Sequence, residues 1–230
     1  MTIRGKKYEK ALEALGESKK PLSLREGIAK LKMVAHARFD ESVSVDINLG
    51  IDPSKGDQVV RGGVVLPRGS GKKSRVLVFA KGEYADQATA AGADFVGAED
   101  LVQKIEAGWF DFEYAVATPD LMGLIGKVAR VLGPMGLLPN KKLGTVTFDI
   151  KSIVSELKKG LVFFRNDKQG LVHFMCGKVS FSEQDLFDNV SAFIKALSAA
   201  KPPVSKGKFI KKVVITPTMG PGIQVAVDEL

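Results

Sequence analysis

Val76-Leu77-Val78-Phe79-Ala80 is a short apolar run in the middle of the chain, with no polar residue inside it. Such a run is typical of a strand in a parallel sheet, which is buried on both faces. Helical patterns at 84–91 and 101–107 follow it and alternate with strand patterns at 95–96 and 114–117. This alternation predicts an α/β unit, Rossmann-like and three-layered, in the middle of the chain.

The chain before this run has a different pattern. Ser23 and Glu26 match a capping box, which predicts that a helix begins at residue 24. From 43 to 51, apolar residues alternate with Ser, Asp, Asn and Gly, which is typical of a half-buried strand. A further strand is predicted at 64–66.

The chain after the α/β region returns to antiparallel signals. The turn sequence Asp167-Lys168-Gln169-Gly170 lies between apolar runs at 161–164 and 171–174, which predicts a hairpin. Ser182 begins a helical pattern with one apolar face. Two more strands are predicted, at 210–215 and 223–227.

The two outer segments are each too short to form a stable domain alone. At about 70 residues a single hydrophobic core is marginal. We therefore predict that residues 1–68 and 159–230 combine into one discontinuous α+β domain. Residues 69–158 then form an inserted α/β domain, which two neighbouring strands join to the first domain as a hinge.

Net charge is distributed unevenly along the 230 residues, whose 34 basic and 26 acidic side chains give +8. Segment 1–68 has 13 basic and 9 acidic side chains (+4), and segment 159–230 has 10 and 6 (+4). Segment 69–158 has 11 of each and is neutral. The excess on the outer segments predicts a polyanionic partner there, or a surface kept soluble by its charge.

Several classes of protein are excluded. The single cysteine, Cys176, cannot form an internal disulfide, which fits a reducing compartment. No run of about 18 apolar residues is present, so no membrane-spanning helix is predicted. Residues 1–20 carry charges throughout and lack the apolar core of a secretory signal. We expect a cytoplasmic protein that does not bind a membrane.

Enzymatic motifs are missing from the sequence. Gly69-Ser70-Gly71-Lys72-Lys73-Ser74 lacks the glycine that a P-loop needs at position 66, and it precedes a strand rather than a helix. His36 and His173 have no residues at metal-ligand spacing, and Asp167, the one acid near His173, is explained by its turn. We therefore predict no catalytic site, cofactor, metal or small-molecule substrate.

The most informative candidate for RNA binding is the segment Thr216-Pro217-Thr218-Met219-Gly220-Pro221-Gly222, between the last two strands. Thr218 offers a hydroxyl, Met219 a flexible apolar contact and Gly220 a close approach of the backbone. This combination suits the recognition of ribose and bases. A rigid hairpin loop without a ligand explains the glycine and proline residues equally well, so both interpretations stay open.

Two other groups of residues have the same ambiguity. Phe39, within Arg38-Phe39-Asp40-Glu41-Ser42, either stacks on a base or packs beneath the preceding helix. Arg165, Lys168 and Lys178 flank the predicted hairpin and either contact phosphates or form a solvated face.

A third group lies in the inserted domain, at 126–136. Lys127 and Arg130 are predicted near a helix C-terminus, where the helix dipole favours cations, and Gly133-Pro134 is predicted to stop that helix. The segment is either a second nucleic-acid contact or an ordinary helix end and turn.

Many of the residues discussed above lie in a series of motifs that match one known family. The motifs are Phe39-Asp40-Glu41-Ser42-Val43, Leu49-Gly50-Ile51-Asp52-Pro53, Gly92-Ala93-Asp94, Ala117-Thr118-Pro119-Asp120, Leu132-Gly133-Pro134, Gly136-Leu137, Pro139-Asn140, Gly144-Thr145-Val146, Phe164-Arg165-Asn166-Asp167-Lys168 and Thr218-Met219-Gly220-Pro221. The matches are collinear and cover nearly the whole chain. The sequence resembles the family of the bacterial large-subunit ribosomal protein "L-one", the protein of the mobile stalk.

The resemblance implies a two-domain protein whose discontinuous first domain holds the main RNA site. Members of this family bind a structure in large-subunit ribosomal RNA and build the stalk beside the tRNA exit site, where it helps deacylated tRNA to leave. Bacterial members also bind a similar structure in their own messenger RNA and repress its translation. The implied partners are these three RNAs, and the implied location is the ribosome in the cytoplasm.

The resemblance also implies a set of RNA-binding residues in the outer segments. The family's contacts match Phe39 and the Thr218-Met219-Gly220 stretch among others, and basic residues near the start of the chain reach phosphates. The expected RNA-binding residues are Arg4, Lys6, Lys7, Arg38, Phe39, Ser42, Arg165, Lys168, Thr216, Thr218, Met219 and Gly220.

The sequence departs from the family pattern at three places. Met135 stands where the family usually has Arg, Lys141 stands where it usually has Pro, and residues 173–176 differ from the usual stretch. The missing arginine leaves a tRNA contact of the inserted domain open.

Two other functions fit the residues less well. The first is an enzyme whose α/β domain binds a nucleotide. The absence of a phosphate-binding motif from the sequence argues against this function. The second is a non-ribosomal RNA chaperone or assembly factor with the same fold.

Overall fold

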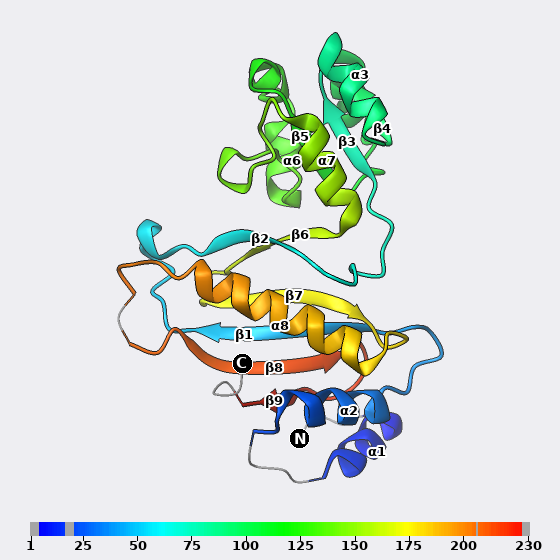
Figure 1. The fold of residues 1–230 in the computed structure, drawn as a ribbon, viewed down its shortest axis with the longest axis vertical. Coiled ribbons are helices and arrows are strands. Elements are labelled where there is room, and N and C mark those ends of the chain that lie inside the picture. The colour runs from blue at the N-terminus through cyan, green and yellow to red at the C-terminus, as the bar shows by residue number, and fades with distance from the viewer. Residues whose placement is uncertain (1–4, 17–20, 206, 227–230) are drawn as a thin grey trace. The chain divides into compact units, whose positions relative to one another are not determined.

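The computed structural model describes residues 5–16, 21–205 and 207–226. The chain divides into two compact units. Unit 1 is formed by Met1–Gly71 and Val162–Leu230, so both ends of the chain contribute to it, and unit 2 is Lys72–Leu161. The protein is a mixed α/β protein, with an antiparallel sheet in unit 1 and a parallel sheet in unit 2 (Figure 1).

Unit 1 is built on a four-stranded antiparallel sheet with the order β7-β1-β8-β9. Its strands are β1 Ser42–Leu49, β7 Leu171–Lys178, β8 Ile210–Pro217 and β9 Ile223–Val225. The alternation predicted along the first strand is confirmed, because its valine, isoleucine and leucine side chains are buried and the residues between them are not. The last strand ends at Val225, and position 227 of its predicted range lies outside the described residues.

The helices of unit 1 are α1 Lys6–Leu15, α2 Leu24–Val34, α8 Glu183–Ala199 and a short 3-10 helix, η1 Gly56–Gln58. The predicted capping box of α2 is confirmed, with Ser23 Oγ accepting from Glu26 N and Glu26 Oε2 accepting from Ser23 N. Helix α8 begins at Ser182 as predicted, whose Oγ accepts from Asp185 N at 3.1 Å. None of the described helices is long and apolar enough to cross a bilayer.

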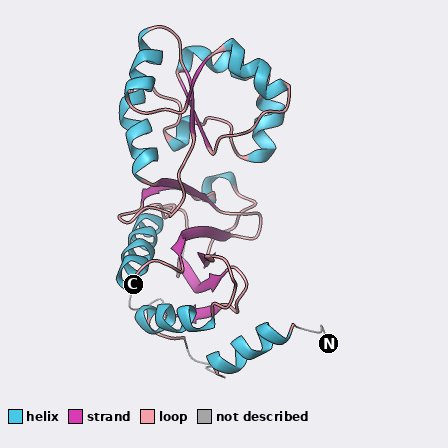
Figure 2. Cartoon of the chain, turned by 90° about the vertical axis from the view of Figure 1, so that its right-hand side faces the viewer, coloured by secondary structure: helices cyan, strands magenta, loops and turns pink. Residues whose placement is uncertain are grey.

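Helices cover one face of the four-stranded sheet. Helix α2 contacts β8 and β9, and α8 contacts β7, and Figures 1 and 2 show both helices on the same side of the sheet. Because side chains alternate along a strand, the residues between the buried ones point to the other side. We call that side the open face. Its strand residues are Ser42, Ser44, Asp46, Asn48, His173, Met175, Lys178, Lys212, Val214 and Thr216.

Three phenylalanine rings form the centre of the core of unit 1. Phe174 of β7 stacks on Phe193 of α8, with ring centroids 4.0 Å apart and planes 5° from parallel. Phe164 meets both rings edge-on. Cys176 lies in the same core as a free thiol, and burial raises its pKa far above the usual range. The thiol is therefore unreactive while unit 1 is folded.

The turn predicted at 167–170 is present and is closed by the antiparallel bridge between Asn166 and Val172, but the predicted pairing of 161–164 with 171–174 is wrong. Strand β6 Leu161–Arg165 pairs with β2 Arg61–Val65 in a separate two-stranded sheet, whereas β7 joins the four-stranded sheet. The chain changes sheets at Asn166, which is buried. Its Oδ1 accepts from Val60 N at 2.8 Å and its Nδ2 donates to Asp167 O at 2.8 Å. A side chain that binds two backbone segments redirects the strand, which local turn chemistry cannot reveal.

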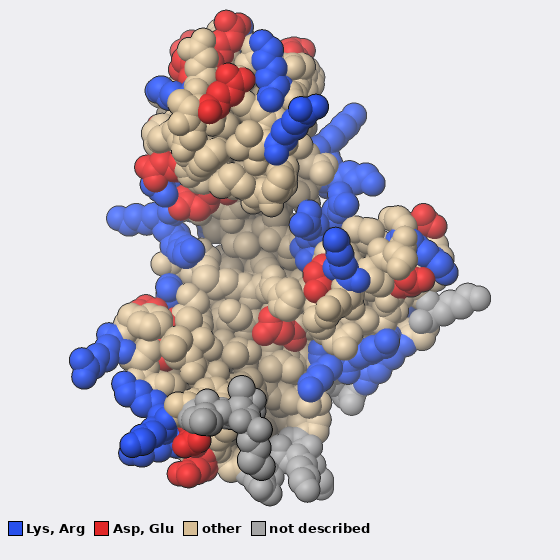
Figure 3. Space-filling view, turned by 180° about the vertical axis from the view of Figure 1, so that it is seen from behind, with Lys and Arg blue, Asp and Glu red and all other residues tan. Residues whose placement is uncertain are grey.

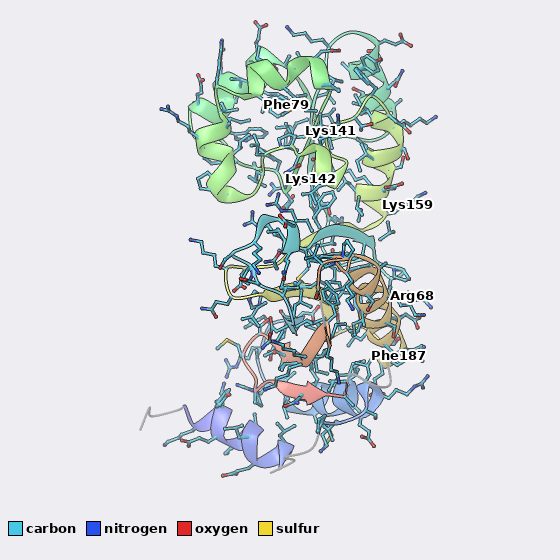
Figure 4. The ribbon with its side chains drawn as sticks, turned by 90° about the vertical axis from the view of Figure 1, so that its left-hand side faces the viewer. Arg68, Phe79, Lys141, Lys142, Lys159 and Phe187 are labelled. Atoms are coloured by element: carbon cyan, nitrogen blue, oxygen red, sulfur yellow. The ribbon has the colours of Figure 1, made fainter. Side chains whose placement is uncertain are left out.

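Asn189 of α8 binds the backbone at 68–69, close to the point where the first part of unit 1 ends. It is fully buried; its Oδ1 accepts from Arg68 N at 3.1 Å, and its Nδ2 donates to Gly69 O at 3.0 Å and Cys176 O at 2.7 Å. The Arg68 guanidinium lies on the outside, 3.0 Å from Asp185 and near Phe187 along the helix (Figure 4). The side chain of Asn189 therefore fixes the backbone just before the chain leaves unit 1.

Unit 2 contains a parallel sheet with the order β4-β3-β5, formed by β3 Val76–Phe79, β4 Phe95–Gly97 and β5 Tyr114–Ala117. All four residues of β3 are buried, as its apolar run predicts. The helices are α3 Glu83–Ala90, α4 Glu99–Glu106, α5 Met122–Ile125, α6 Ala129–Met135 and α7 Ile150–Lys159, with 3-10 helices η2 Pro119–Leu121 and η3 Lys141–Leu143.

Helices cover both faces of the parallel sheet. Leu77 and Phe79 pack in one cluster with apolar residues of α4, α5 and α6. Val76 and Val78 alternate with them and point to the other face, where α3 and α7 contact β3. A strand flanked on both faces must be apolar throughout, which explains the unbroken run in the sequence.

Two predicted helix boundaries in unit 2 need correction. Gly133-Pro134 does not stop a helix: α6 contains both residues and ends at Gly136, whose φ of 73° is left-handed. Pro134 is tolerated because the carbonyl that it leaves unpaired belongs to Arg130, which is exposed to water. Arg130 therefore lies in the first turn of α6, not at a C-terminus. The pair Thr118-Pro119 in the sequence predicts a helix that Thr118 caps and Pro119 begins. Pro119 does begin a helix, but it is a 3-10 helix to which the Thr118 side chain gives no cap.

Candidate nucleic-acid interface

The net positive charge lies almost entirely in unit 1. Over Met1–Gly71 and Val162–Leu230 there are 22 basic and 15 acidic side chains, a difference of +7. Unit 2 has 12 and 11, a difference of +1. Figure 3 shows the rear of the molecule, with basic side chains mostly at the margins of the lower part and acidic ones between them. Unit 1 is thus the unit that attracts a polyanion.

A buried carboxylate joins two loops at one end of the sheet. Glu41 is only 2% exposed. Its Oε1 accepts from His36 N at 3.0 Å and Ala37 N at 2.8 Å, and its Oε2 accepts from Met219 N at 2.9 Å. We call these four residues the Glu41 cluster. Three backbone N–H groups donate to the two oxygens of one carboxyl group, so the loop after α2 and the loop after β8 are held together.

The hydroxyl of Thr218 makes a second connection between the same loops. Its Oγ1 accepts from Ser42 N at 2.9 Å and donates to Ser42 O at 3.3 Å. The Ser42 side chain is also engaged, because its Oγ accepts from Lys178 Nζ at 2.9 Å. Thr218 and Ser42 therefore position the backbone, and the Thr218 hydroxyl has already used its one proton.

Two large apolar side chains face solvent at this end of the sheet, one from Met219 of the Glu41 cluster and one from Phe39, two residues before Glu41. Phe39 is 56% exposed and Met219 is 54% exposed. The alternative in which Phe39 packs beneath the preceding helix is therefore wrong. Since Glu41 binds the backbone on both sides, it fixes where these two side chains emerge. Exposed apolar residues that are held rigidly are suited to stacking on a partner.

Gly220 allows the tight turn that places Met219. A Cβ added to Gly220 would lie 2.6 Å from Pro217 Cγ and 3.5 Å from Val34 O. No side chain fits at that distance, so the loop requires glycine for close packing and not for a positive φ. Arg38, next to Phe39, is exposed at the same end of the sheet.

Two exposed cations lie near the turn at 167–170: Arg165 is the last residue of β6, and Lys168 is within the turn. Asp167 fixes that turn, since its Oδ1 accepts from Leu171 N and Gln169 N, each at 2.8 Å. These hydrogen bonds, led by the one from Leu171, hold the pKa of the Asp167 carboxyl below its usual range. The backbone that carries Lys168 is therefore held in place by hydrogen bonds.

Sequence reasoning missed a cluster in the middle of the open face. His173 of β7 lies opposite Asp46 of β1, with its Nδ1 2.6 Å from Asp46 Oδ1. Asp46 Oδ2 accepts from Thr216 Oγ1 of β8 at 3.3 Å, and His173 Nε2 is 4.0 Å from Asp167 Oδ2. Alternation in the sequence places Asp46 on the exposed side of its strand, but only the strand register brings it to His173.

The structure does not bring every expected residue to this surface. Arg4 lies outside the described residues. Lys6 and Lys7 are exposed on α1, which contacts α2. Lys127 lies in the turn between α5 and α6, and Met135 is 50% exposed at the end of α6, both in unit 2.

The described residues contain no group of three or more histidine, cysteine or acidic side chains that could hold a metal ion. The basic segment at 69–74 precedes β3, as expected, and does not begin a helix that could receive a phosphate.

Comparison with known protein families gives a match over residues 31–221 to the model described as "Ribosomal protein L1p/L10e family". The matched range includes Glu41, Phe39, the open face and the loop up to Gly220. It covers most of both units. The chain therefore belongs to the ribosomal protein L1p/L10e family, which makes it an RNA-binding ribosomal protein and not an enzyme.

Proposed function

We propose that unit 1 binds a structured segment of large-subunit ribosomal RNA through the open face and the end of the sheet where Phe39 and Met219 emerge. The observation that carries this proposal is the Glu41 cluster, which fixes two exposed apolar side chains on the basic unit. Single-stranded and bulged bases are recognised by such stacking surfaces, and phosphates by the surrounding cations.

We also propose a division of labour between the units. Unit 1 is the discontinuous α+β RNA-binding domain, and unit 2 is an inserted, Rossmann-like, three-layer arm with little net charge. Together they form the mobile stalk beside the tRNA exit site of the large subunit and assist the release of deacylated tRNA. At position 135 unit 2 presents an exposed methionine, so a tRNA contact there is apolar.

The same RNA face supports regulation of the protein's own synthesis. We propose that a structure in its messenger RNA occupies the open face in place of ribosomal RNA and represses translation. Because one face serves both RNAs, they compete for it. A non-ribosomal assembly factor of the same fold would bind RNA as well but would not remain on mature subunits.

Co-sedimentation with large ribosomal subunits tests the stalk proposal. The full-length protein should sediment with subunits that lack their own copy and should be released by an excess of its ribosomal RNA segment. Binding to free ribosomal RNA without retention on finished subunits would favour the assembly-factor function instead.

Replacing Met219 by Ala should weaken specific RNA binding by roughly 1–3 kcal/mol, because a stacking contact is lost while the Glu41 hydrogen bond, which uses the backbone, remains. Thr218→Val should have an effect of similar size by releasing Ser42. The measurement is a filter-binding titration at fixed salt. Met33→Ala is the matched control, since Met33 is 76% exposed on α2, away from the open face. Equal affinities of all variants would contradict this assignment.

The double variant Arg165→Ala, Lys168→Ala should change the salt dependence of binding more than its specificity. Each lost phosphate contact lowers the slope of log affinity against log salt by about one. The slope is obtained from titrations between about 50 and 200 mM salt. Lys30→Ala with Lys195→Ala removes two cations from α2 and α8, which lie on the other side of the sheet, and should leave the slope unchanged. Identical slopes for both double variants would refute phosphate contact at the turn.

A further inference from the structure

A row of polar side chains crosses the middle of the open face. It runs from Asp167 in the turn, through His173 on β7 and Asp46 on β1, to Thr216 on β8. His173 is 59% exposed, and the two carboxylates are each about one-third exposed. The row is therefore accessible to a ligand that lies on the sheet.

This row has the wrong chemistry for a phosphate. Two carboxylates repel an anion and offer only acceptors. The donors of RNA that acceptors can bind are the ribose 2′-hydroxyls and the N–H groups of the bases. The open face therefore has two kinds of surface. The cations at its margins attract the phosphates of the RNA, and the acceptors in its middle require an RNA group that donates a hydrogen bond.

The distance between His173 and Asp167 matches a hydroxyl group. Nε2 and Oδ2 are 4.0 Å apart, which is too far for a direct hydrogen bond. An oxygen placed between them at about 2.8 Å from each atom would meet both at an angle near 90°. An imidazolium ring whose Nδ1–H donates to Asp46 presents Nε2–H outward. The hydroxyl then accepts from Nε2–H and donates to Oδ2, so both of its functions are used.

The other hydroxyl-binding candidate is already occupied. Thr218 gives its proton to Ser42 O and accepts from Ser42 N, so it cannot both donate to and accept from a ribose. Asp167 is different: its Oδ1 is taken by the two turn amides, whereas Oδ2 faces His173.

We propose that His173 and Asp167 bind a ribose 2′-hydroxyl of the RNA, with Asp46 and Thr216 as positioning residues that orient the imidazole ring. The proposal rests on the function proposed above, that the open face binds RNA. It gives the face a means of distinguishing RNA from DNA that cations alone do not provide.

The proposed site takes up a proton when it binds RNA. Histidine side chains change charge between pH 5 and 8, and only the imidazolium form donates from both ring nitrogens. The carboxylates within 4.0 Å of the ring are Asp46 and Asp167, and hydrogen bonds from Leu171 and Gln169 keep Asp167 ionised in this range. Binding that requires the proton strengthens as the pH falls from 7.5 to 5.5.

The experiment uses the full chain and a fragment of large-subunit ribosomal RNA that the protein protects from ribonuclease. The fragment is synthesised with all riboses and as a series with single 2′-deoxy positions. At constant ionic strength, affinity for the all-ribose fragment should rise about tenfold between pH 7.5 and pH 5.5, as expected for a charge-assisted hydrogen bond. His173→Gln, which keeps one donor and one acceptor without titrating, should bind with a flat pH profile.

At one position of the fragment, replacing ribose by 2′-deoxyribose should remove the pH dependence of its affinity for the unmodified protein. The same replacement should not weaken binding to His173→Gln any further. Met33→Ala is the control, since Met33 is 76% exposed on α2 and lies away from the open face. It should keep the pH dependence.

The outcomes separate this inference from the proposed function. Equal pH profiles for the unmodified protein and His173→Gln, or a deoxy series in which no position matters, would overturn the hydroxyl site while RNA binding stands. Failure of every variant to bind the fragment at any pH would instead refute the proposed RNA face.

Discussion

Replacing Glu41 by Gln should destabilise unit 1 by about 2–4 kcal/mol, because a buried carboxylate that accepts three backbone N–H groups becomes an amide with a single acceptor oxygen. Whichever way the amide turns, its NH2 group faces an N–H donor. Either Met219 N or the pair His36 N and Ala37 N is left buried without a partner. The same change should weaken RNA binding, since Phe39 and Met219 are no longer held together.

Two intrinsic probes make the loss of stability measurable in unit 1 alone. Cys176 is fully buried in unit 1 and becomes reactive to thiol reagents only when that unit opens. Trp109, the one tryptophan of the chain, packs edge-on against Phe95 in unit 2 at 4.7 Å. Glu41→Gln should shift the denaturant midpoint of Cys176 labelling and leave that of Trp109 fluorescence unchanged.

Glu26→Gln is the matched control for this substitution. Glu26 is an exposed carboxylate in the capping box of α2, a position at which glutamine also accepts the hydrogen bond. Its effect should be within about 0.5 kcal/mol. If Glu41→Gln were as mild as this control, the Glu41 cluster would not be what holds the two loops, and Phe39 and Met219 would not form a preformed RNA site.

Replacing Asn189 by Leu should cost unit 1 about 3 kcal/mol. The two side chains are similar in size, but leucine leaves Arg68 N, Gly69 O and Cys176 O without their partners. An unsatisfied buried backbone group costs about 1–3 kcal/mol, and the added apolar burial offsets about 1–2 kcal/mol of the total. The backbone at 68–69, just before the chain leaves unit 1, should also become mobile.

The measurement combines Cys176 labelling with hydrogen exchange of the amide of Arg68. Both should accelerate in Asn189→Leu while the fluorescence transition of Trp109 stays in place. Gln184→Leu is the control on the same helix, because the Gln184 side chain is exposed and its Nε2 donates a hydrogen bond to the Asp188 side chain. A stability of Asn189→Leu equal to that of the control would show that this side chain does not anchor the segment.

Much of the local structure could be predicted from the sequence because it depends on neighbouring residues. The capping box at Ser23 and Glu26, the buried run of β3 and the alternation along β1 are all set by side chains within a few positions of one another. The location of the excess positive charge could be predicted for the same reason, since charge is counted residue by residue. The family motifs include Phe39, Glu41 and Met219, but they do not reveal the hydrogen bonds by which Glu41 joins the two loops.

What the sequence by itself determined was therefore the type of many elements, though not of helices α1 and α7, together with the family and the sign of the net charge. The tertiary structure decided which strand pairs with which, and hence which side chains meet. The chain switches sheets at Asn166 because of a hydrogen bond to Val60, 106 positions away in the sequence. Glu41 reaches Met219 across 178 positions, and Asp46 reaches His173 across 127. Such contacts depend on strand register and on backbone amides, which every residue possesses, so no pattern of side chains along the chain can reveal them.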